Sequence, residues 1–201
     1  MSSVPQILLQ AEALGCERNG RLLFGLIDLA LCAGEVIWLR GGNGSGKTTL
    51  IRALAGLHRP ATGRVARSAP LKYVGHASGL KAALTVEEGL QLAARLEGAR
   101  PDSVARALSH FGLGGLKRRR SLQLSQGQRR RAALAPLALG PQGRAVWLLD
   151  EPFDALDEEG VHALVRLTTE HRARGGALLF TSHQAVPALQ AALTLRELAL
   201  A

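Results

Sequence analysis

The chain has 201 residues, of which 47% are hydrophobic and 23 are glycine. This composition excludes a disordered or fibrous chain and fits one domain with a sizeable core. The formal net charge of +9 comes largely from basic runs at 117–120 and 129–131. Only 3% of the residues are aromatic, which leaves little surface for stacking on single strands. We therefore expect a solvated or membrane-facing basic surface and no nucleic-acid partner.

Two further features narrow the class of protein. Cys16 and Cys32 have neither C-x-x-C nor metal-ligand spacing, so we expect ordinary small residues in a reducing compartment. The most apolar stretch, residues 22–39, is interrupted by Asp28 and Glu35. It therefore predicts strands and a turn, and we expect the chain to be soluble or peripheral to a membrane.

The first quarter of the chain predicts strands followed by a helix. Apolar runs predict strands at 7–13 and 22–31 and a buried strand at 35–40, and residues 47–55 have helical periodicity. Between the last strand and the helix lies GGNGSGKT, residues 41–48. This stretch matches the phosphate-loop pattern G-x-x-x-x-G-K-[ST] in its expected context.

The loop predicts a nucleotide phosphate site. Its glycines let backbone N–H groups close around phosphate oxygens, while Lys47 can reach the β- and γ-phosphates and Thr48 can hold Mg²⁺. The residues expected to bind the nucleotide here are Gly41, Gly42, Asn43, Gly44, Ser45, Gly46, Lys47, Thr48 and Thr49.

The middle of the chain predicts a helical insertion. Pro60 and Gly63 are expected to break the pattern before a short strand in LKYVGH, which ends at His76. Apolar spacing over 85–112 then predicts two helices, separated near Gly98.

The stretch LSQGQRRRAALAP, residues 124–136, predicts a helix with an anion site at its start. Ser125 and Gly127 lead into an arginine- and alanine-rich run, and backbone N–H groups at a helix start attract anions. No carboxylate or histidine stands beside them to do chemistry. Pro136 predicts that this helix kinks or ends early.

The last part of the chain predicts strand, helix and strand, in AVWLLD, EEGVHALVRLTTEHRARGG and ALLFTSH. Continuous apolar strands alternating with helices indicate a mostly parallel sheet covered on both faces. Asp150 and Glu151 end the first of these strands, at the edge where open α/β sheets bind ligands. Asp150 fits a metal-side aspartate and Glu151 a group that polarises water; the alternative is a surface acidic pair.

Five motifs in this order resemble the ATP-binding subunits of ABC transporters. They are the phosphate loop, LSQGQ, LLDEP, ALD at 155–157, and TSH ending at His183, and LSQGQ is similar to the family signature LSGGQ. The resemblance covers nearly the whole chain. It implies a single nucleotide-binding domain over 1–201, with an α/β, RecA-like P-loop NTPase core (1–75 and 136–201) and a helical subdomain (76–135).

The resemblance also implies which subunit binds the anion that lies at the start of the LSQGQ helix. In this family two subunits form an ATP-dependent homodimer, packed head to tail, with ATP and Mg²⁺ between them. Ser125, Gly127 and Gln128 would then contact the γ-phosphate held by the partner subunit. His183 would contact the γ-phosphate in its own subunit and couple it to Glu151, the expected catalytic base.

Three positions need comment against the family pattern. Asp157 would lie at the dimer interface. His76 stands where most of these ATPases have a glutamine that senses Mg²⁺ and the membrane partner, so it is a candidate nucleotide-site residue of a different kind. The early strand region CERNGRLLF has no tyrosine to stack on adenine; Arg18 or Asn19 occupies about that place, and an arginine plane could stack instead.

Within the family, the chain is similar to the ATP-binding subunits of the cytochrome c biogenesis system, through YVGHASGLKAALT, LDEPF and TSHQ. This implies a haem exporter ATPase, bound to integral membrane subunits of the CcmB and CcmC kind at the cytoplasmic face of the inner membrane. The alternatives are a lipoprotein or small-molecule exporter, a nucleic-acid-associated ABC ATPase, and a non-hydrolysing module. The absence of a long heptad insertion or second cassette counts against the nucleic-acid alternative, and intact Lys47, Asp150 and Glu151 against the last.

Overall fold

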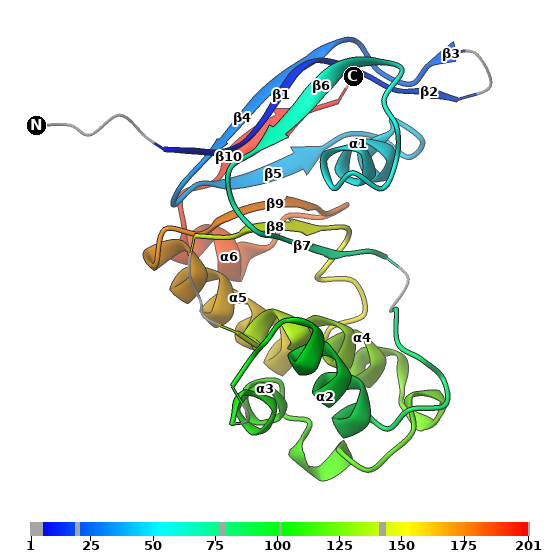
Figure 1. The fold of residues 1–201 in the computed structure, drawn as a ribbon, viewed down its shortest axis with the longest axis vertical. Helices are drawn as coiled ribbons and strands as arrows, with labels where there is room; N and C mark the ends of the chain where they lie inside the picture. The colour runs from blue at the N-terminus through cyan, green and yellow to red at the C-terminus, as the bar shows by residue number, and fades with distance from the viewer. Residues whose placement is uncertain (1–5, 19–20, 77–78, 101, 141–143, 201) are drawn as a thin grey trace, which may run out of the picture.

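A parallel sheet forms the centre of the molecule in a computed structural model, which describes residues 6–18, 21–76, 79–100, 102–140 and 144–200 (Figure 1). Its strand order is β10 (Arg196–Ala199), β5 (Val36–Arg40), β9 (Ala177–Thr181), β8 (Val146–Leu149) and β7 (Leu71–Val74). All four neighbouring pairs run parallel. The expected α/β fold with a mostly parallel sheet is therefore confirmed.

The two faces of this sheet bury alternate side chains of each strand. In β5, Ile37 and Leu39 belong to one apolar cluster, while Val36 and Trp38 belong to the other. The inner strands β8 and β9 are buried along their whole length. This pattern explains why the sequence shows continuous apolar runs rather than alternation of apolar and polar residues.

A second, antiparallel sheet covers one side of the molecule, at the top of Figure 1. Its order is β4 (Ile27–Cys32), β1 (Ile7–Gly15) and β6 (Thr62–Arg67), and a short hairpin joins β2 (Glu17–Arg18) to β3 (Arg21–Leu22). The helix α1 (Lys47–Leu54) lies between this sheet and the parallel one (Figure 1). On the opposite face of the parallel sheet lie α5 (Glu158–Ala173) and α6 (Pro187–Ala192).

Two sequence expectations for this region were wrong. The run 22–31 is not one strand, because the chain leaves the strand direction after Leu22 and buries Phe24 against Gly46 of the phosphate loop. Gly63 does not end the regular structure but lies inside β6. It takes a positive φ of 78°, and a Cβ there would collide with the carbonyl oxygen of Glu12, so a glycine suits a strand that crowds β1.

The helical lobe lies on the far side of α5 and α6, at the bottom of Figure 1. It contains α2 (Val86–Leu96), α3 (Ser103–His110), the 3₁₀ turns at Gly114–Leu116 and Ser121–Gln123, and α4 (Gln126–Leu134). Thr85 and Glu88 form a capping box that starts α2. A 3₁₀ turn at Ala135–Ala138, with Pro136 in its first turn, follows α4, which confirms that the helix ends early.

One apolar cluster is shared between lobe and sheet. It combines Leu90 of α2 and Leu108 of α3 with Trp147 and Phe180 of the parallel sheet. The division into a core of 1–75 and 136–201 and a subdomain of 76–135 stays a prediction. Within the described ranges, no helix is long and apolar enough to cross a membrane.

His171 of α5 is buried against the start of β8. Its ring stacks on Trp147 with centroids 3.7 Å apart and an interplanar angle of 7°, and its Nε2 lies 3.0 Å from the carbonyl oxygen of Ala145. A Cβ at Gly176 would collide with the same ring. Burial lowers the pKa of His171 to about 4, against an ordinary value of 6.5, despite an opposing contribution from the carbonyl contact.

This histidine makes the fold sensitive to acid. Because the unfolded chain protonates His171 near pH 6.5 and the folded chain only near pH 4, stability is lost as the pH falls between these values. We expect this one group to remove about 3 kcal/mol from the free energy of unfolding over that range. Denaturant titrations of wild type and His171→Phe at several pH values measure it. The variant should lack this part of the pH dependence, whereas His162→Phe, at an exposed position of the same helix, should keep it.

Candidate functional site

The phosphate loop connects β5 to α1 and closes around its own lysine. Gly44 and Gly46 have positive φ angles of 80° and 94°, which bend the loop back so that α1 begins at Lys47. Lys47 is 7% exposed, and its Nζ donates to the carbonyl oxygens of Gly41 and Gly42 at 2.8 Å and 2.9 Å. The lysine is therefore held beside the first turn of α1, whose N–H groups favour an anion.

Asp150 joins the loop to two strands of the parallel sheet. Its Oδ1 accepts from the hydroxyl of Thr48 at 3.3 Å and from the hydroxyl of Thr181 at 2.9 Å. Asp150 is 1% exposed, and its Oδ2 is buried without a hydrogen-bond partner in the described part of the chain. An unpaired buried carboxylate oxygen is costly, and it marks a position suited to a cation or a bound water.

Glu151 and His183 face each other at the same edge. The Nε2 of His183 lies 3.5 Å from Glu151 Oε1, and its backbone N–H donates to Glu151 Oε2 at 3.2 Å. The backbone N–H of Glu151 donates to the hydroxyl of Thr181 at 2.8 Å. Glu151 is a non-glycine residue with φ of 50°, a strained conformation that these contacts help to hold.

These groups line one cavity of about 340 Å³. It is lined by Leu23, Asn43, Gly44, Ser45, Gly46, Lys47, Thr48, Thr49, His76, Asp150, Glu151 and His183. Gly41 and Gly42 take part through the carbonyl groups that hold Lys47. The structure thus brings together the residues that sequence analysis assigned to the phosphates and their cation within a single subunit.

Ser125, Gly127 and Gln128 do not line this cavity. Ser125 caps α4, because its hydroxyl accepts from the N–H of Gln128 at 3.2 Å while its own N–H donates to Gln128 Oε1 at 3.1 Å. The backbone N–H groups of Ser125 and Gln128, which sequence analysis left available for an anion, therefore already have partners at the start of the helix. A Cβ at Gly127 would lie 2.9 Å from the carbonyl oxygen of Ala155, so this glycine permits a close approach of α4 to 155–157.

His76 lines the cavity, whereas Asp157 does not. His76 lies at the mouth of the cavity, with Nδ1 4.0 Å from Asp154 Oδ2 and 70% of its side chain exposed. Asp157 caps α5 through the N–H of Gly160 at 3.0 Å and approaches Arg131 at 3.4 Å. Asn19 and the side chain of Arg18, the expected adenine neighbours, lie outside the described part of the structure.

Sequence analysis missed two residues of this site. Thr181 stands at the end of a buried strand. The available signal was a hydroxyl at the end of this strand, since parallel strands place it at the same sheet edge as the acidic pair that ends the other strand. Arg130 was assigned to a solvated basic run, but it is only 5% exposed, and its guanidinium points into the core. The assignment was wrong because adjacent arginines carry no signal of which one faces inward; the packing of α4 decides it.

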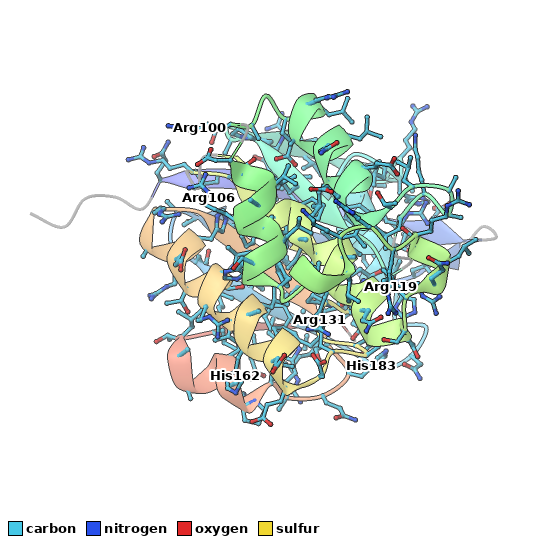
Figure 2. The ribbon with its side chains drawn as sticks, turned by 90° about the horizontal axis from the view of Figure 1, so that it is seen from below. Arg100, Arg106, Arg119, Arg131, His162 and His183 are labelled. Carbon is cyan, nitrogen blue, oxygen red and sulfur yellow. The ribbon has the colours of Figure 1, made fainter. Side chains whose placement is uncertain are left out.

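The exposed basic side chains of the lobe are spread over its surface. Figure 2 shows Arg100 and Arg106 at one side of the lobe and Arg119 at the other. Arg100 and Arg106 lie 3.5 Å and 3.6 Å from the carboxylate of Asp102. Such exposed pairs contribute little to stability and fit a solvated surface.

Comparison with known proteins places this geometry in a family. The ABC transporter family model matches residues 25–154. A cytochrome c biogenesis ATP-binding export protein CcmA from Alkalilimnicola ehrlichii is 46% identical, with 88% of this chain and 80% of the relative covered. A CcmA from Salmonella typhimurium is 43% identical, covering 96% and 97%.

Solved structures share the fold. The ATP-binding subunit of an ABC transporter superposes with a TM-score of 0.83 at 24% identity, covering 96% of this chain and 88% of the other. A dimeric ATP-binding cassette in a post-hydrolysis state, bound to ADP and Pi, gives 0.81 at 19% identity and covers 96% of each chain. The chain therefore belongs to the ABC transporter family, as an ATP-binding subunit that hydrolyses ATP.

Proposed function

We propose that this chain is the ATPase subunit of a haem exporter that serves cytochrome c biogenesis. The observation that carries the proposal is the 41–46% identity to CcmA proteins over most of the chain. The site supports the energy-coupling half of this function, because the phosphate loop, Asp150, Glu151 and His183 line one cavity. The haem cargo is inferred from the relatives.

Nucleotide binding begins with the phosphate loop. In this role Lys47 exchanges the carbonyl oxygens of Gly41 and Gly42 for β- and γ-phosphate oxygens, while N–H groups from the loop and the start of α1 surround them. The lysine is already buried and oriented, so little side-chain freedom remains to be lost on binding.

The residues beside the loop fit a hard divalent cation, and Mg²⁺ is the one we propose. Thr48 and Asp150 would hold it, since Thr48 Oγ1 and Asp150 Oδ1 are 3.3 Å apart and the buried Asp150 Oδ2 has no hydrogen-bond partner among the described residues. The cation would neutralise charge on the β- and γ-phosphates. Thr181 fixes the Asp150 carboxylate from the sheet side through its hydroxyl.

Glu151 is the proposed general base. Its two carboxylate oxygens face the backbone N–H and the ring of His183, which orients the carboxylate at the mouth of the phosphate site. From that position it would take a proton from the water that attacks the γ-phosphorus in line. His183 would bridge the γ-phosphate and Glu151, so that the base is in place only when the phosphate is bound.

The proposed active form is a head-to-tail homodimer. Ser125 of one subunit would contact the γ-phosphate held by the other, together with the N–H groups of Gln126 and Gly127, which have no partner earlier in α4. Among the described residues, the Ser125 hydroxyl accepts from the Gln128 N–H and donates to no other group, so its own hydrogen is available to the phosphate.

The proposed contact with the membrane subunits lies between lobe and core. A cavity of about 840 Å³ runs there, lined on one side by α2 and on the other by the edge strand β7. Leu57, Leu92 and Leu96 are exposed at its rim, where an apolar partner segment would cover them. We place the complex at the cytoplasmic face of the inner membrane, with integral subunits of the CcmB and CcmC kind.

The role of Glu151 is tested by Glu151→Gln. An amide can orient water but cannot accept its proton, so ATP hydrolysis should fall at least about a hundredfold while ATP binding stays intact. Because the nucleotide is then trapped, light scattering with Mg-ATP should show a dimer. The control is Glu170→Gln, an exposed position on α5, which should behave as wild type. Fast hydrolysis by Glu151→Gln would move the base elsewhere, with His183 the first candidate.

The composite site is tested by mixing two inactive subunits. In a dimer of a Ser125→Arg subunit and a Lys47→Ala subunit, one site carries both lesions and the other carries neither. ATPase activity should therefore return to about half of wild type, if one intact site suffices. Each variant alone should stay inactive. No recovery in purified heterodimers would count against a contribution of Ser125 across the interface.

The biological role is tested in a deletion strain. Cells without this subunit should accumulate apocytochrome c without covalent haem, whereas b-type haem proteins persist. Haem-stained gels should show recovery with the wild-type gene but not with Glu151→Gln. Normal c-type cytochromes, in a strain without a second copy or another maturation system, would reject the haem-exporter role and favour a lipoprotein or small-molecule exporter.

A further inference from the structure

Arg130, in the middle of α4, is a buried cation whose five N–H donors all meet backbone carbonyl oxygens. It is 5% exposed, and none of the ion pairs found in the described ranges includes it. The bonds are Nε to Pro152 at 3.3 Å, one terminal nitrogen to Gly75 at 2.9 Å and His76 at 3.4 Å, and the other to Asp150 at 2.9 Å and Glu151 at 2.6 Å. A guanidinium has five donors, so this set is complete.

The five carbonyls belong to two separate segments of the site. Gly75 and His76 follow β7, while residues 150–152 form the turn after β8. The shortest bond goes to Glu151, the residue with φ of 50°. A positive φ is unfavourable for a residue with a Cβ, so the hydrogen bond from Arg130 to the Glu151 carbonyl oxygen helps to hold the backbone of the turn in this conformation.

The charge of Arg130 is kept at some cost. Burial lowers the pKa of Arg130, and the negative charges of Asp154, Asp150 and Glu151 oppose this effect. If the guanidinium only filled space, an apolar side chain of similar volume could take its place without loss of stability. The complete donor set indicates a role in fixing backbone positions.

We propose that Arg130 is a positioning residue for hydrolysis, which locks the backbone of Glu151 to α4 and to the segment that carries His76. The inference rests on the proposed role of Glu151 as the base. Arg130 does not touch the nucleotide cavity; it acts through the turn that aims the Glu151 carboxylate.

The contacts of Arg130 also link the start of α4, which would meet the partner's nucleotide, to the Glu151 turn of its own subunit. Ser125 starts α4, and Arg130 follows about 7.5 Å along the helix axis. A displacement of α4 when its start meets the partner's nucleotide therefore moves the Glu151 turn with it. Gly127, packed against the carbonyl of Ala155, keeps the helix close to the continuation of that turn. The geometry makes α4 a rigid connection between nucleotide contact in one subunit and the base of its own site.

The test compares Arg130→Gln and Arg130→Lys with Arg166→Gln, the same loss of charge on the exposed face of α5. Lys has three donors and cannot span all five carbonyls. We expect kcat to fall about a hundredfold in Arg130→Gln and about tenfold in Arg130→Lys, with the Kd for Mg-ATP within about threefold of wild type. Arg166→Gln should match wild type in both quantities.

A double-mutant cycle separates positioning from general support of the fold. If Arg130 acts through Glu151, adding either Arg130 substitution to Glu151→Gln should leave the residual hydrolysis within about twofold. The inference would be overturned if an Arg130 substitution lowered hydrolysis by the same factor in the Glu151→Gln variant as in the wild-type protein. A wild-type kcat in Arg130→Lys, or a weakening of ATP binding that parallels the loss of kcat, would also overturn it. Should Arg130→Gln not fold, Arg130→Lys carries the same cycle. Fast hydrolysis by Arg130→Gln beside slow Glu151→Gln rejects this inference alone, whereas fast Glu151→Gln rejects the proposed base.

Discussion

The carboxylate of Asp150 is the contact on which the rest of the site depends. Through Thr48 it fixes the start of α1, and through Thr181 it fixes the neighbouring strand β9. Parallel strands end at the same edge, so one aspartate can reach hydroxyls contributed by segments about a hundred and about thirty residues away in the sequence. The same threonine also fixes the backbone of the next residue, Glu151, because the Glu151 N–H donates to the Thr181 hydroxyl.

The arrangement requires a rigid sheet beneath it. Strands β8 and β9 are buried along their whole length, and each sends alternate side chains into the two apolar clusters. Their burial on both faces leaves polar chemistry only at the strand ends, where Asp150 and Thr181 lie. The helical lobe shares one of these clusters, and Arg130 adds a polar connection between α4 and the turn after β8. The lobe and the site are therefore joined by both packing and hydrogen bonds.

Local sequence was enough to predict the parts of the site that need a specific residue type at a specific spacing. The phosphate loop needs glycines with positive φ and a lysine at its end, and the structure has Gly44, Gly46 and Lys47 in these roles. The order of strands and helices followed from apolar periodicity. The strand β6 was missed because Gly63 breaks local propensity, while its pairing with β1 depends on a distant segment. The helix α6 and the edge strand β10 are short, and the sequence showed no periodic signal for them.

The sequence by itself therefore determined the fold class, the phosphate loop and the acidic pair, because each depends on residues within a few positions of one another. Only the tertiary structure decided which groups meet across the chain. Thr181 reaches Asp150 over 31 positions, and Arg130 reaches Glu151 over 21. Adjacent arginines look alike in sequence, yet Arg130 is buried while its neighbour Arg129 is only partly so, because the rotation of α4 against the core points one side chain inward. Such a rotation is set by packing between elements, which no short stretch of sequence contains.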